Sequence, residues 1–330
     1  MTKQKTAANS RWMASAARCA LPLLVAGVAL PASAGHNNHA YVVNQAGNTV
    51  SVIDMATNDV TATISVGFTP VAAAVSPDGN RVYVANSQAN TVSVIDALTN
   101  IVAAEVPVGS TPAAVTVGAD GRKAYVANSG DDTVSVIDAT TNTVSSTIAV
   151  GSTPLSIAAG PLGARVYTGN IGDGTVSVID TRAGRTVATV PVNGVPFGLD
   201  VGPFGARLYA PDIGSNGVAV VDTLKNAVIG TLAAGNGAYD VATSLVGTPV
   251  YVSNFADNTV SVIEPLSRKT LATVAVGNSP EAVAVSRYSG RVYITNSGSN
   301  NVSVIDPFSN KVVATVGVGN SPAAVATQPE

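Results

Sequence analysis

A five-residue stretch, Val50-Ser51-Val52-Ile53-Asp54, returns in nearly the same form six more times along the chain. The copies end at Asp54, Asp96, Asp138, Asp180, Asp222, Glu264 and Asp306, so each step is 42 residues long. Seven repeats of 42 residues make 294, which leaves only the first 36 of the 330 residues outside the array. Self-similarity at this interval indicates a repeat fold in which each repeat forms one structural unit.

Each repeat is predicted to form four short strands. In one repeat the strand-like runs are 112–117, 123–128, 133–138 and 143–150, all rich in Val, Ile or Thr. Gly, Asp and Asn lie between the runs, and no segment keeps a helical period. Four-stranded units of this length are typical of propeller blades. We therefore predict an all-β chain, a seven-bladed β-propeller of four-stranded antiparallel blades.

Two further residue types keep the same interval. A tyrosine recurs in the second strand of every blade, at Tyr41, Tyr83, Tyr125, Tyr167, Tyr209, Tyr251 and Tyr293. A proline precedes the first strand at Pro70, Pro112, Pro154, Pro196, Pro280 and Pro322, and only Ala238 interrupts that series. Because a catalytic residue has no reason to recur seven times, we interpret the tyrosines as packing residues with hydrogen-bonded hydroxyls.

The two ends of the repeat array complement each other. The first predicted strand, 40–44, matches the second strand of a blade, and the last segment, 322–328, matches a first strand. We therefore predict that the C-terminal strand completes the N-terminal blade and closes the ring.

Residues 1–34 have the order of parts of a cleaved signal peptide. Four basic residues and no acid come first, then an apolar run from Cys19 to Leu30, then Ala32-Ser33-Ala34. A membrane anchor is the rival interpretation, but the run is short of the ~20 residues needed to span a bilayer. We expect cleavage after Ala34, an N-terminal tail over 35–40, and one propeller domain over 41–330. The protein is then exported, to the periplasm or the cell surface.

Without the leader the chain is acidic. It keeps 13 of 17 basic residues and all 20 acidic ones, a net charge of −7. That sign disfavours nucleic acid, whose binding depends on Lys and Arg neutralising phosphates. Cys19 and Trp12 are the only residues of their types and leave with the leader, so neither a disulfide nor a thiolate metal site is expected. We expect no transmembrane segment in the mature chain and a monomer.

The repeats resemble the YVTN family of β-propeller repeats. The resemblance rests on motifs such as Tyr83-Val84-Ala85-Asn86, Thr91-Val92-Ser93-Val94-Ile95-Asp96 and Ser76-Pro77-Asp78-Gly79, and it covers the chain from about Ala40 onward. That family occurs in archaeal surface-layer proteins and exported bacterial proteins. The resemblance implies the fold and an exported location, while relatives of this shape include both binding proteins and enzymes.

Residues that such enzymes require are scarce. The only histidines, His36 and His39, lie in the predicted tail, where two imidazoles alone fall short of the three or four ligands of a metal site. A general base would have to be a carboxylate with a raised pKa. We therefore expect no metal and no cofactor.

Departures from the repeat gather in consecutive blades and define the candidate site. They place aromatic and acidic residues near one rim of the channel: Phe197, Asp200, Asp212, Tyr239, Asp240, Phe255 and Glu281. Asp200 and Asp240 occupy first-strand positions that elsewhere hold small residues, where an unpaired buried charge costs several kcal/mol. They should reach the water-filled channel or accept backbone hydrogen bonds. The alternative is that repeats drift and both residues merely cap local backbone.

Three functions remain open. The leading hypothesis is an exported binding scaffold without catalysis, which contacts a protein, a glycan or a small polar ligand at the channel rim. The second is a carboxylate-based or metal-assisted enzyme acting on a lactone or sugar acid at the channel mouth. The third is an accessory role beside a periplasmic quinone or haem redox system.

Overall fold

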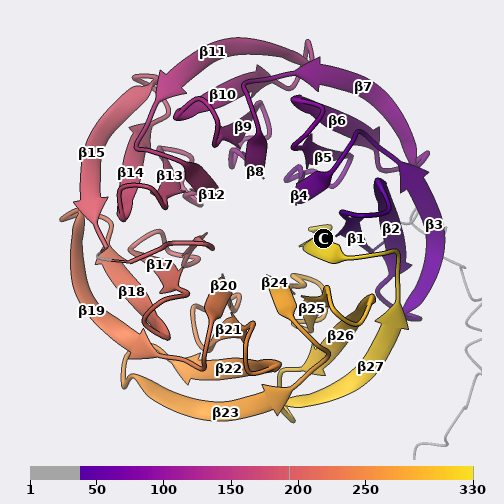
Figure 1. The fold of residues 1–330 in the computed structure, drawn as a ribbon, viewed down its shortest axis with the longest axis vertical. Coiled ribbons are helices and arrows are strands. Elements are labelled where there is room, and N and C mark those ends of the chain that lie inside the picture. Colours follow the sequence, from indigo (N-terminus) through magenta and orange to yellow (C-terminus); the bar gives the residue numbers. More distant parts are fainter. Residues whose placement is uncertain (1–37, 193, 330) are drawn as a thin grey trace, which may run out of the picture. The chain divides into compact units, whose positions relative to one another are not determined.

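The computed structural model describes residues 38–192 and 194–329, which form a ring of seven four-stranded antiparallel sheets (Figure 1). The predicted leader and His36 lie outside the described residues. Blade 1, from the channel to the outer edge of the ring, consists of β28 (Pro322–Thr327), β1 (His39–Asn44), β2 (Thr49–Asp54) and β3 (Asp59–Ser65). Within the described part of the chain, no helix is both long enough and apolar enough to cross a membrane.

The other six blades follow in chain order, each from the channel outward. Blades 2 and 3 are β4 (Pro70–Val75), β5 (Arg81–Asn86), β6 (Thr91–Asp96), β7 (Ile101–Pro107), and β8 (Pro112–Val117), β9 (Lys123–Asn128), β10 (Thr133–Asp138), β11 (Thr143–Ala149). Blades 4 and 5 are β12 (Pro154–Ala159), β13 (Arg165–Asn170), β14 (Thr175–Asp180), β15 (Arg185–Pro191), and β16 (Asp200–Val201), β17 (Arg207–Asp212), β18 (Gly217–Asp222), β19 (Ala227–Ala233). Blades 6 and 7 are β20 (Ala238–Thr243), β21 (Val250–Asn254), β22 (Thr259–Glu264), β23 (Lys269–Ala275), and β24 (Pro280–Val285), β25 (Val292–Asn296), β26 (Asn301–Asp306), β27 (Lys311–Gly317). The predicted fold class is confirmed.

The C-terminal strand closes the ring as predicted. β28 pairs antiparallel with β1, with Ala40 opposite Thr327 and Val43 opposite Ala324. Beyond the strand, the Gln328 N–H donates to the His39 carbonyl at 2.9 Å. The Gln328 amide nitrogen reaches blade 2, where it donates to the Gly79 carbonyl at 2.8 Å. The two chain ends are thus joined by a complete strand pairing that also contacts the next blade.

The core lies between neighbouring blades, where the second and third strands are buried. All seven recurring tyrosines are buried, which confirms their packing role. The predicted hydroxyl hydrogen bonds are wrong for three of the seven tyrosines. The Tyr41 hydroxyl donates to the Ala97 carbonyl at 3.5 Å, but the hydroxyls of Tyr83, Tyr251 and Tyr293 have no partner among the described residues. The rings are held by apolar contact rather than by their polar ends.

The repeated Val-Ser-Val-Ile-Asp segment is the third strand of every blade, and each residue type has a structural task. Its Val and Ile side chains are buried. In six blades its serine accepts a hydrogen bond of 2.8–3.0 Å from the amide of the asparagine that ends the second strand. Its final carboxylate accepts N–H bonds from the following turn, as in Asp96 with Leu98 and Thr99. These bonds hold the pKa of Asp96 below its usual range.

After six of the seven fourth strands, a glycine leaves room for that same asparagine of the following blade. A Cβ on Gly277 would lie 2.6 Å from Asn296 Cγ and 2.7 Å from Asn296 Cβ, closer than real contacts allow. Because Asn296 is fully buried and held by Ser303 and Asn301, it cannot move aside cheaply. The repeated glycine is therefore explained by the lack of room for a Cβ atom beside the asparagine, and not by a special backbone conformation.

We expect Gly277→Ala to lower the free energy of unfolding by about 1–3 kcal/mol, the usual cost of overpacking. Gly317→Ala is the matched control, because a Cβ there meets nothing within 4 Å and the change also reduces unfolded-chain entropy. Urea unfolding of both variants measures the effect. Equal stability of the two would show that the blade accommodates the extra methyl group.

Candidate functional site

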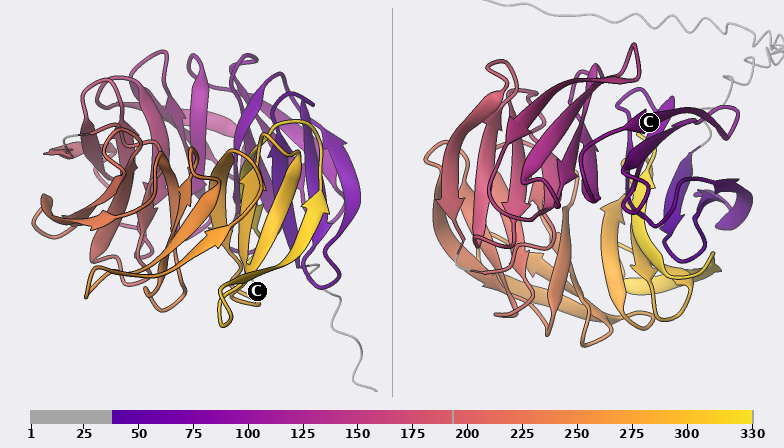
Figure 2. Two further views of the ribbon diagram at one scale, coloured as in Figure 1. Left: turned by 60° about the horizontal axis from the view of Figure 1, so that its bottom comes forward. Right: turned by 45° about the horizontal axis from the view of Figure 1, so that its top comes forward.

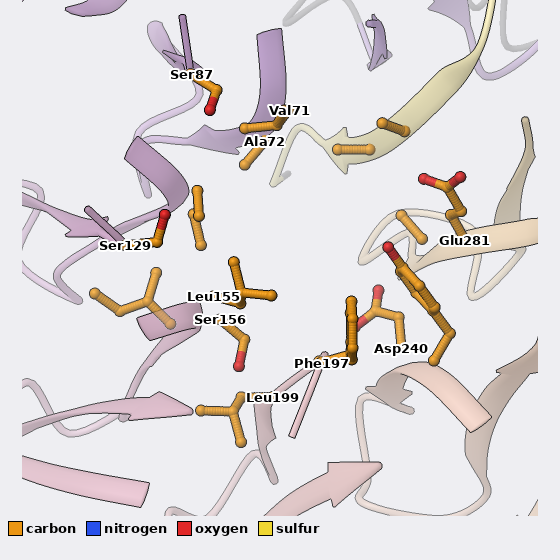
Figure 3. Close-up of a pocket in the computed structure, with 18 of the residues that line it drawn as sticks. Val71, Ala72, Ser87, Ser129, Leu155, Ser156, Phe197, Leu199, Asp240 and Glu281 are labelled. Atoms are coloured by element: carbon orange, nitrogen blue, oxygen red, sulfur yellow. The ribbon is translucent and has the colours of Figure 1, made fainter. Parts of the chain in front are cut away.

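A cavity of about 350 Å³ occupies one mouth of the central channel (Figure 3). It lies where the first strands of the blades begin, so residues from all seven blades border it. Most of its wall is aliphatic, from residues such as Val71, Leu155 and Leu199, with the hydroxyls of Ser87 and Ser129 at intervals. We call this end of the ring the cavity face; it also carries the loops that join second to third strands and successive blades.

Four of the predicted site residues line this cavity together: Phe197, Tyr239, Asp240 and Glu281. Phe197, Tyr239 and Glu281 occupy the same repeat position in blades 5, 6 and 7, one after another around the ring. Figure 3 shows Phe197 beside Asp240, with Glu281 farther along the same wall. One sector of an otherwise aliphatic mouth is therefore aromatic and acidic.

The aromatic part of the sector is a stack of three rings. The Phe197 and Tyr239 ring centroids are 4.9 Å apart with an interplanar angle of 38°. Tyr239 and Phe255 are 5.6 Å apart at 25°. Phe255 does not line the cavity; it supports Tyr239 from behind. Phe197 borders the cavity and is free to contact a ligand there (Figure 3).

Asp200 and Asp240 each bond to the first strand of the following blade. Asp240 Oδ2 accepts a hydrogen bond from the Val283 N–H in β24 at 2.9 Å. Asp200 Oδ2 accepts one from the Thr243 N–H in β20 at 2.7 Å. Both bonds span 43 residues, so each carboxylate joins its own blade to the first strand of the next blade. The expected backbone hydrogen bonds are present, and these two join neighbouring blades.

The surroundings of these carboxyl groups raise their pKa values. Burial raises the pKa of Asp240 to about 7, and the Asp200 charge adds to this, against N–H bonds from Val283 and Val241. Burial raises the pKa of Asp200 to about 6, against its bonds to Thr243 and Val201. Burial also raises the pKa of Glu281. Both aspartates are partly buried in the protein.

Along the first strand of its blade, Asp200 lies two residues farther into the channel than the position equivalent to Asp240. It does not line the cavity. Asp212 lies away from the cavity as well, where Oδ1 accepts N–H bonds from Val195 at 2.9 Å and Gly214 at 3.1 Å. It stands where other blades have the buried asparagine, and Ala219 stands where they have its serine partner. Asp212 and Ala219 therefore replace the two partners of one hydrogen bond found in the other blades, and their role is structural.

The first strands of blades 5–7 are loosened beside the cavity, for a reason that the sequence analysis missed. In regular blades Ala72 pairs with Ala85, and its equivalents pair alike. At that position of the second strand, blade 5 has Pro211, which has no N–H to donate. Blades 6 and 7 have Ser253 and Thr295, whose hydroxyls accept from the Asp240 N–H at 3.1 Å and the Ala282 N–H at 2.9 Å. Strand pairing skips this position in all three blades.

Gly198 is a further residue that the sequence analysis missed. A Cβ at this position would lie 2.4 Å from Asp240 Oδ1 and 2.7 Å from Asp240 Cα. Any larger residue would therefore displace the Asp240 carboxylate or separate the first strands of blades 5 and 6. The sequence held one signal for it: Gly198 stands in the predicted first strand of its blade, and the next blade has the acidic Asp240 at the equivalent repeat position.

The prediction for His39 is wrong. It was placed in a tail over 35–40, but it is the first residue of β1 and is buried. Its N–H donates to Gln328 Oε1 at 2.9 Å, so the ring closure draws it into the sheet. Burial lowers its pKa, against the nearby Asp54 carboxylate. Its role is structural, and the described residues contain no group of three or more His, Cys, Asp or Glu side chains placed to hold a metal ion.

No family model and no curated protein sequence matches the chain. Several solved structures share its fold. A hydrazine synthase chain from Kuenenia stuttgartiensis has a TM-score of 0.72 at 23% identity, over 78% of this chain and 89% of that one. A functionally unknown protein from Desulfotomaculum acetoxidans has a TM-score of 0.79 at 20% identity, over 89% and 100%. The dihydro-heme d1 dehydrogenase NirN has a TM-score of 0.67 at 18% identity, over 87% and 66%. At these identities the likeness shows the fold alone.

Proposed function

We propose that this propeller is an exported binding protein without catalysis of its own, which holds a small ligand at the cavity. The observation that carries the proposal is the meeting of Phe197, Tyr239, Asp240 and Glu281 at one mouth of the channel. Small-ligand sites combine apolar walls with a few convergent polar groups in this way. The apolar leader and the resemblance of the repeats to the YVTN family support export.

The charge of the cavity face selects the class of ligand. None of the loops on this face contains Lys or Arg, whereas they carry Asp131, Asp132, Asp173 and Asp257. Within the cavity the ionisable groups are Tyr239, Asp240 and Glu281. An aromatic ring face beside carboxylates attracts an ammonium group through the ring quadrupole and charge together. We therefore propose a small cationic ligand, such as an amine or a quaternary ammonium compound; a sugar acid is disfavoured.

A carboxylate-based enzyme is the second candidate. Burial raises the pKa of Asp240 to about 7, which is close to the optimum for a general base at neutral pH. However, the Asp240 carboxylate is already engaged by the Val283 N–H at 2.9 Å, and a base must be free to take a proton from substrate. An accessory role in a redox system is favoured only by the names of two proteins of the same fold.

We expect choline and tetramethylammonium to bind the wild-type protein measurably by isothermal titration calorimetry, and gluconate not to bind. Phe197→Ala should weaken choline binding by about tenfold, because a desolvated cation–π contact contributes roughly 1–2 kcal/mol. Glu281→Gln should weaken it similarly by removing the charge. Phe68→Ala is the matched control, because Phe68 is an exposed aromatic residue that does not line the cavity.

Three outcomes would contradict the proposal. Gluconate binding tighter than choline binding would reverse the ligand class. Choline binding that is unchanged in Phe197→Ala and Glu281→Gln would place the ligand elsewhere. Turnover of a bound compound that is lost in Asp240→Asn would favour the enzyme instead.

A further inference from the structure

Every Lys and Arg of the described residues lies at the end of the ring opposite the cavity. This end, here the turn face, carries the turns that join first to second strands and third to fourth strands. Figure 2 shows the ring tilted, with connecting turns at both of its ends. All 13 basic residues after the leader lie in those turns or at the start of the strand that follows. Examples are Arg207 at the start of β17 and Lys225 in the turn after β18. The two faces of the ring therefore differ strongly in charge.

The basic residues of the turn face are also unevenly shared among the blades. Blades 4–7 hold ten of the 13, against four acidic residues in the same turns, namely Asp180, Asp222, Glu264 and Asp306. Blades 1–3 hold only Arg81, Arg122 and Lys123, against six acidic residues. The turn face thus has a net charge of +6 over blades 4–7 and −3 over blades 1–3.

Exposed apolar side chains gather on the same four blades. At the tip of the turn between first and second strands, blades 2 and 3 have Asp78 and Asp120. The same tips in blades 4–7 carry Leu162, Phe204, Val246 and Tyr288, each between 55% and 81% exposed. The outer turns of blades 5–7 add Leu224, Leu266 and Phe308, each at least 74% exposed. We call these seven side chains the apolar arc.

Adjacent tips of the arc are close enough to act together. A Cβ on Gly205, next to Phe204, would lie 3.7 Å from Leu162 Cδ1. A Cβ on Gly247, next to Val246, would lie 3.9 Å from Phe204 Cε2. Leu162, Phe204 and Val246 therefore stand on turns that lie side by side, on a face where cations outnumber acids, and are not scattered singly. Such surfaces mark interaction sites.

We propose that the turn face of blades 4–7 docks on an anionic phospholipid surface. The apolar arc stands at the apex of the turns, where it can enter the acyl boundary of a bilayer. The basic residues lie just behind the tips, at the depth of the lipid head groups, where each contributes about 1 kcal/mol of attraction. This geometry orients the cavity face toward the solution, so the proposed ligand site stays open.

Charge complementarity favours a lipid surface over the other occupants. A second copy docking through the same blades would bring two surfaces of +6 together. A nucleic acid would pair with the cations but leave the apolar arc in water, since its backbone offers no apolar surface. An anionic bilayer matches both the charge and the apolar tips.

The test is sedimentation with vesicles, using a chain that begins at Gly35. All 28 strands of the described residues, and the closure contacts, lie within residues 39–328. Removing the apolar leader also removes a rival lipid-binding segment. The vesicles contain phosphatidylcholine alone, or about three parts phosphatidylcholine to one part phosphatidylglycerol. We expect binding to the mixed vesicles that is at least about tenfold stronger than to the neutral ones and is weakened by salt.

Leu162→Asp/Phe204→Asp should weaken binding to the mixed vesicles by at least about tenfold, because two inserted side chains are lost. Asp occupies the same tip position in blades 2 and 3, so this variant should fold, which a melting curve checks. Arg207→Gln/Arg287→Gln should weaken binding about tenfold or more. Leu98→Asp is the matched control, because Leu98 is equally exposed but lies on blade 2; its binding should change by less than about twofold.

Equal binding to neutral and mixed vesicles would overturn the proposal, as would full binding by the folded Leu162→Asp/Phe204→Asp variant. So would a wild-type dimer that this variant converts to a monomer in light scattering without any vesicle binding, since the arc would then be a self-interface. Tight binding of RNA in place of vesicles, unchanged by the Asp variant, would likewise exclude a lipid role.

Discussion

Removal of residues 321–330 should lower the melting temperature by roughly 10 °C or more. The deletion takes away β28, the channel strand of blade 1, and opens the ring at that blade. The strand pairing with β1 and the buried side chain of Val325 are lost. About 1 kcal/mol for each backbone hydrogen bond and 1.5–3 kcal/mol for the valine give a total on the order of 5 kcal/mol. In a protein of this size each kcal/mol shifts Tm by about 2 °C.

The matched control for this deletion is removal of residues 329–330 alone, which leaves β28 and the bonds of Gln328 in place. It should melt as the wild type does. A synthetic peptide of residues 321–330, added in excess to the truncated protein, should restore part of the lost stability by binding the folded state. A melting curve of the truncated protein that coincides with the wild-type curve would sink the closure as a source of stability.

The stability of the wild-type protein should fall as the pH rises from 5 to 8, because of Asp200 and Asp240. Their folded pKa values, about 6 and about 7, lie above the ordinary value of 3.8. A carboxyl group whose pKa is raised in the folded state contributes its full stabilisation below its unfolded pKa. That stabilisation is lost as the pH rises through the folded pKa. At ~1.4 kcal/mol per pH unit, the two groups together should cost about 4 kcal/mol between pH 5 and pH 8.

Other groups act in the opposite direction and bound this pH window. The carboxylates that cap turns, such as Asp96 and Asp306, have folded pKa values lowered by turn N–H bonds. Their stabilising effect is present above about pH 4 and is lost on acidification below it. The pKa of His39 is lowered by burial, so its burial costs free energy below about pH 6.5. Stability should therefore be greatest in mildly acidic solution.

Asp200→Asn/Asp240→Asn isolates the contribution of the two carboxylates. An asparagine oxygen can still accept from the Thr243 and Val283 N–H groups, but it does not titrate in this range. Urea unfolding at pH 5 and pH 8 should show nearly equal stability for this variant, which should exceed the wild type at pH 8. Asp59→Asn, an exposed acid on β3, serves as the control and should keep the wild-type dependence. A wild-type protein with no loss of stability above pH 5 would contradict the assignment.

Much of the fold could be predicted because its determinants are local and repeated. The strand boundaries 112–117, 123–128 and 133–138 were predicted as the structure has them, since turn residues and the period of two operate within a few residues. Ring closure followed from the mismatch of the two ends with the repeat. His39 was misplaced because its burial depends on Gln328, which lies 289 residues away in sequence.

The candidate site could be predicted only in part. Departures from the repeat identified Phe197, Tyr239, Asp240 and Glu281, because the shared repeat position implied a shared rim. The same reasoning also included Asp212 and Asp200. Asp212 and Ala219 together replace a hydrogen-bonded pair of the other blades, and Asp200 lies deeper in the channel. It missed Gly198, Ser253 and Thr295, since a small or hydroxyl residue in a strand gives no signal until its neighbour in space is known.

The sequence by itself determined the blade, the number of blades and the closing strand, because a blade is built from strands that follow one another in the chain. Only the tertiary structure decided what passes between blades. The Asp240 bond to Val283, the stacked rings of blades 5 and 6 and the apolar arc all join residues about one repeat apart. Their distances depend on how the ring curves and how closely its first strands approach, and those quantities are set by side-chain packing around the whole ring.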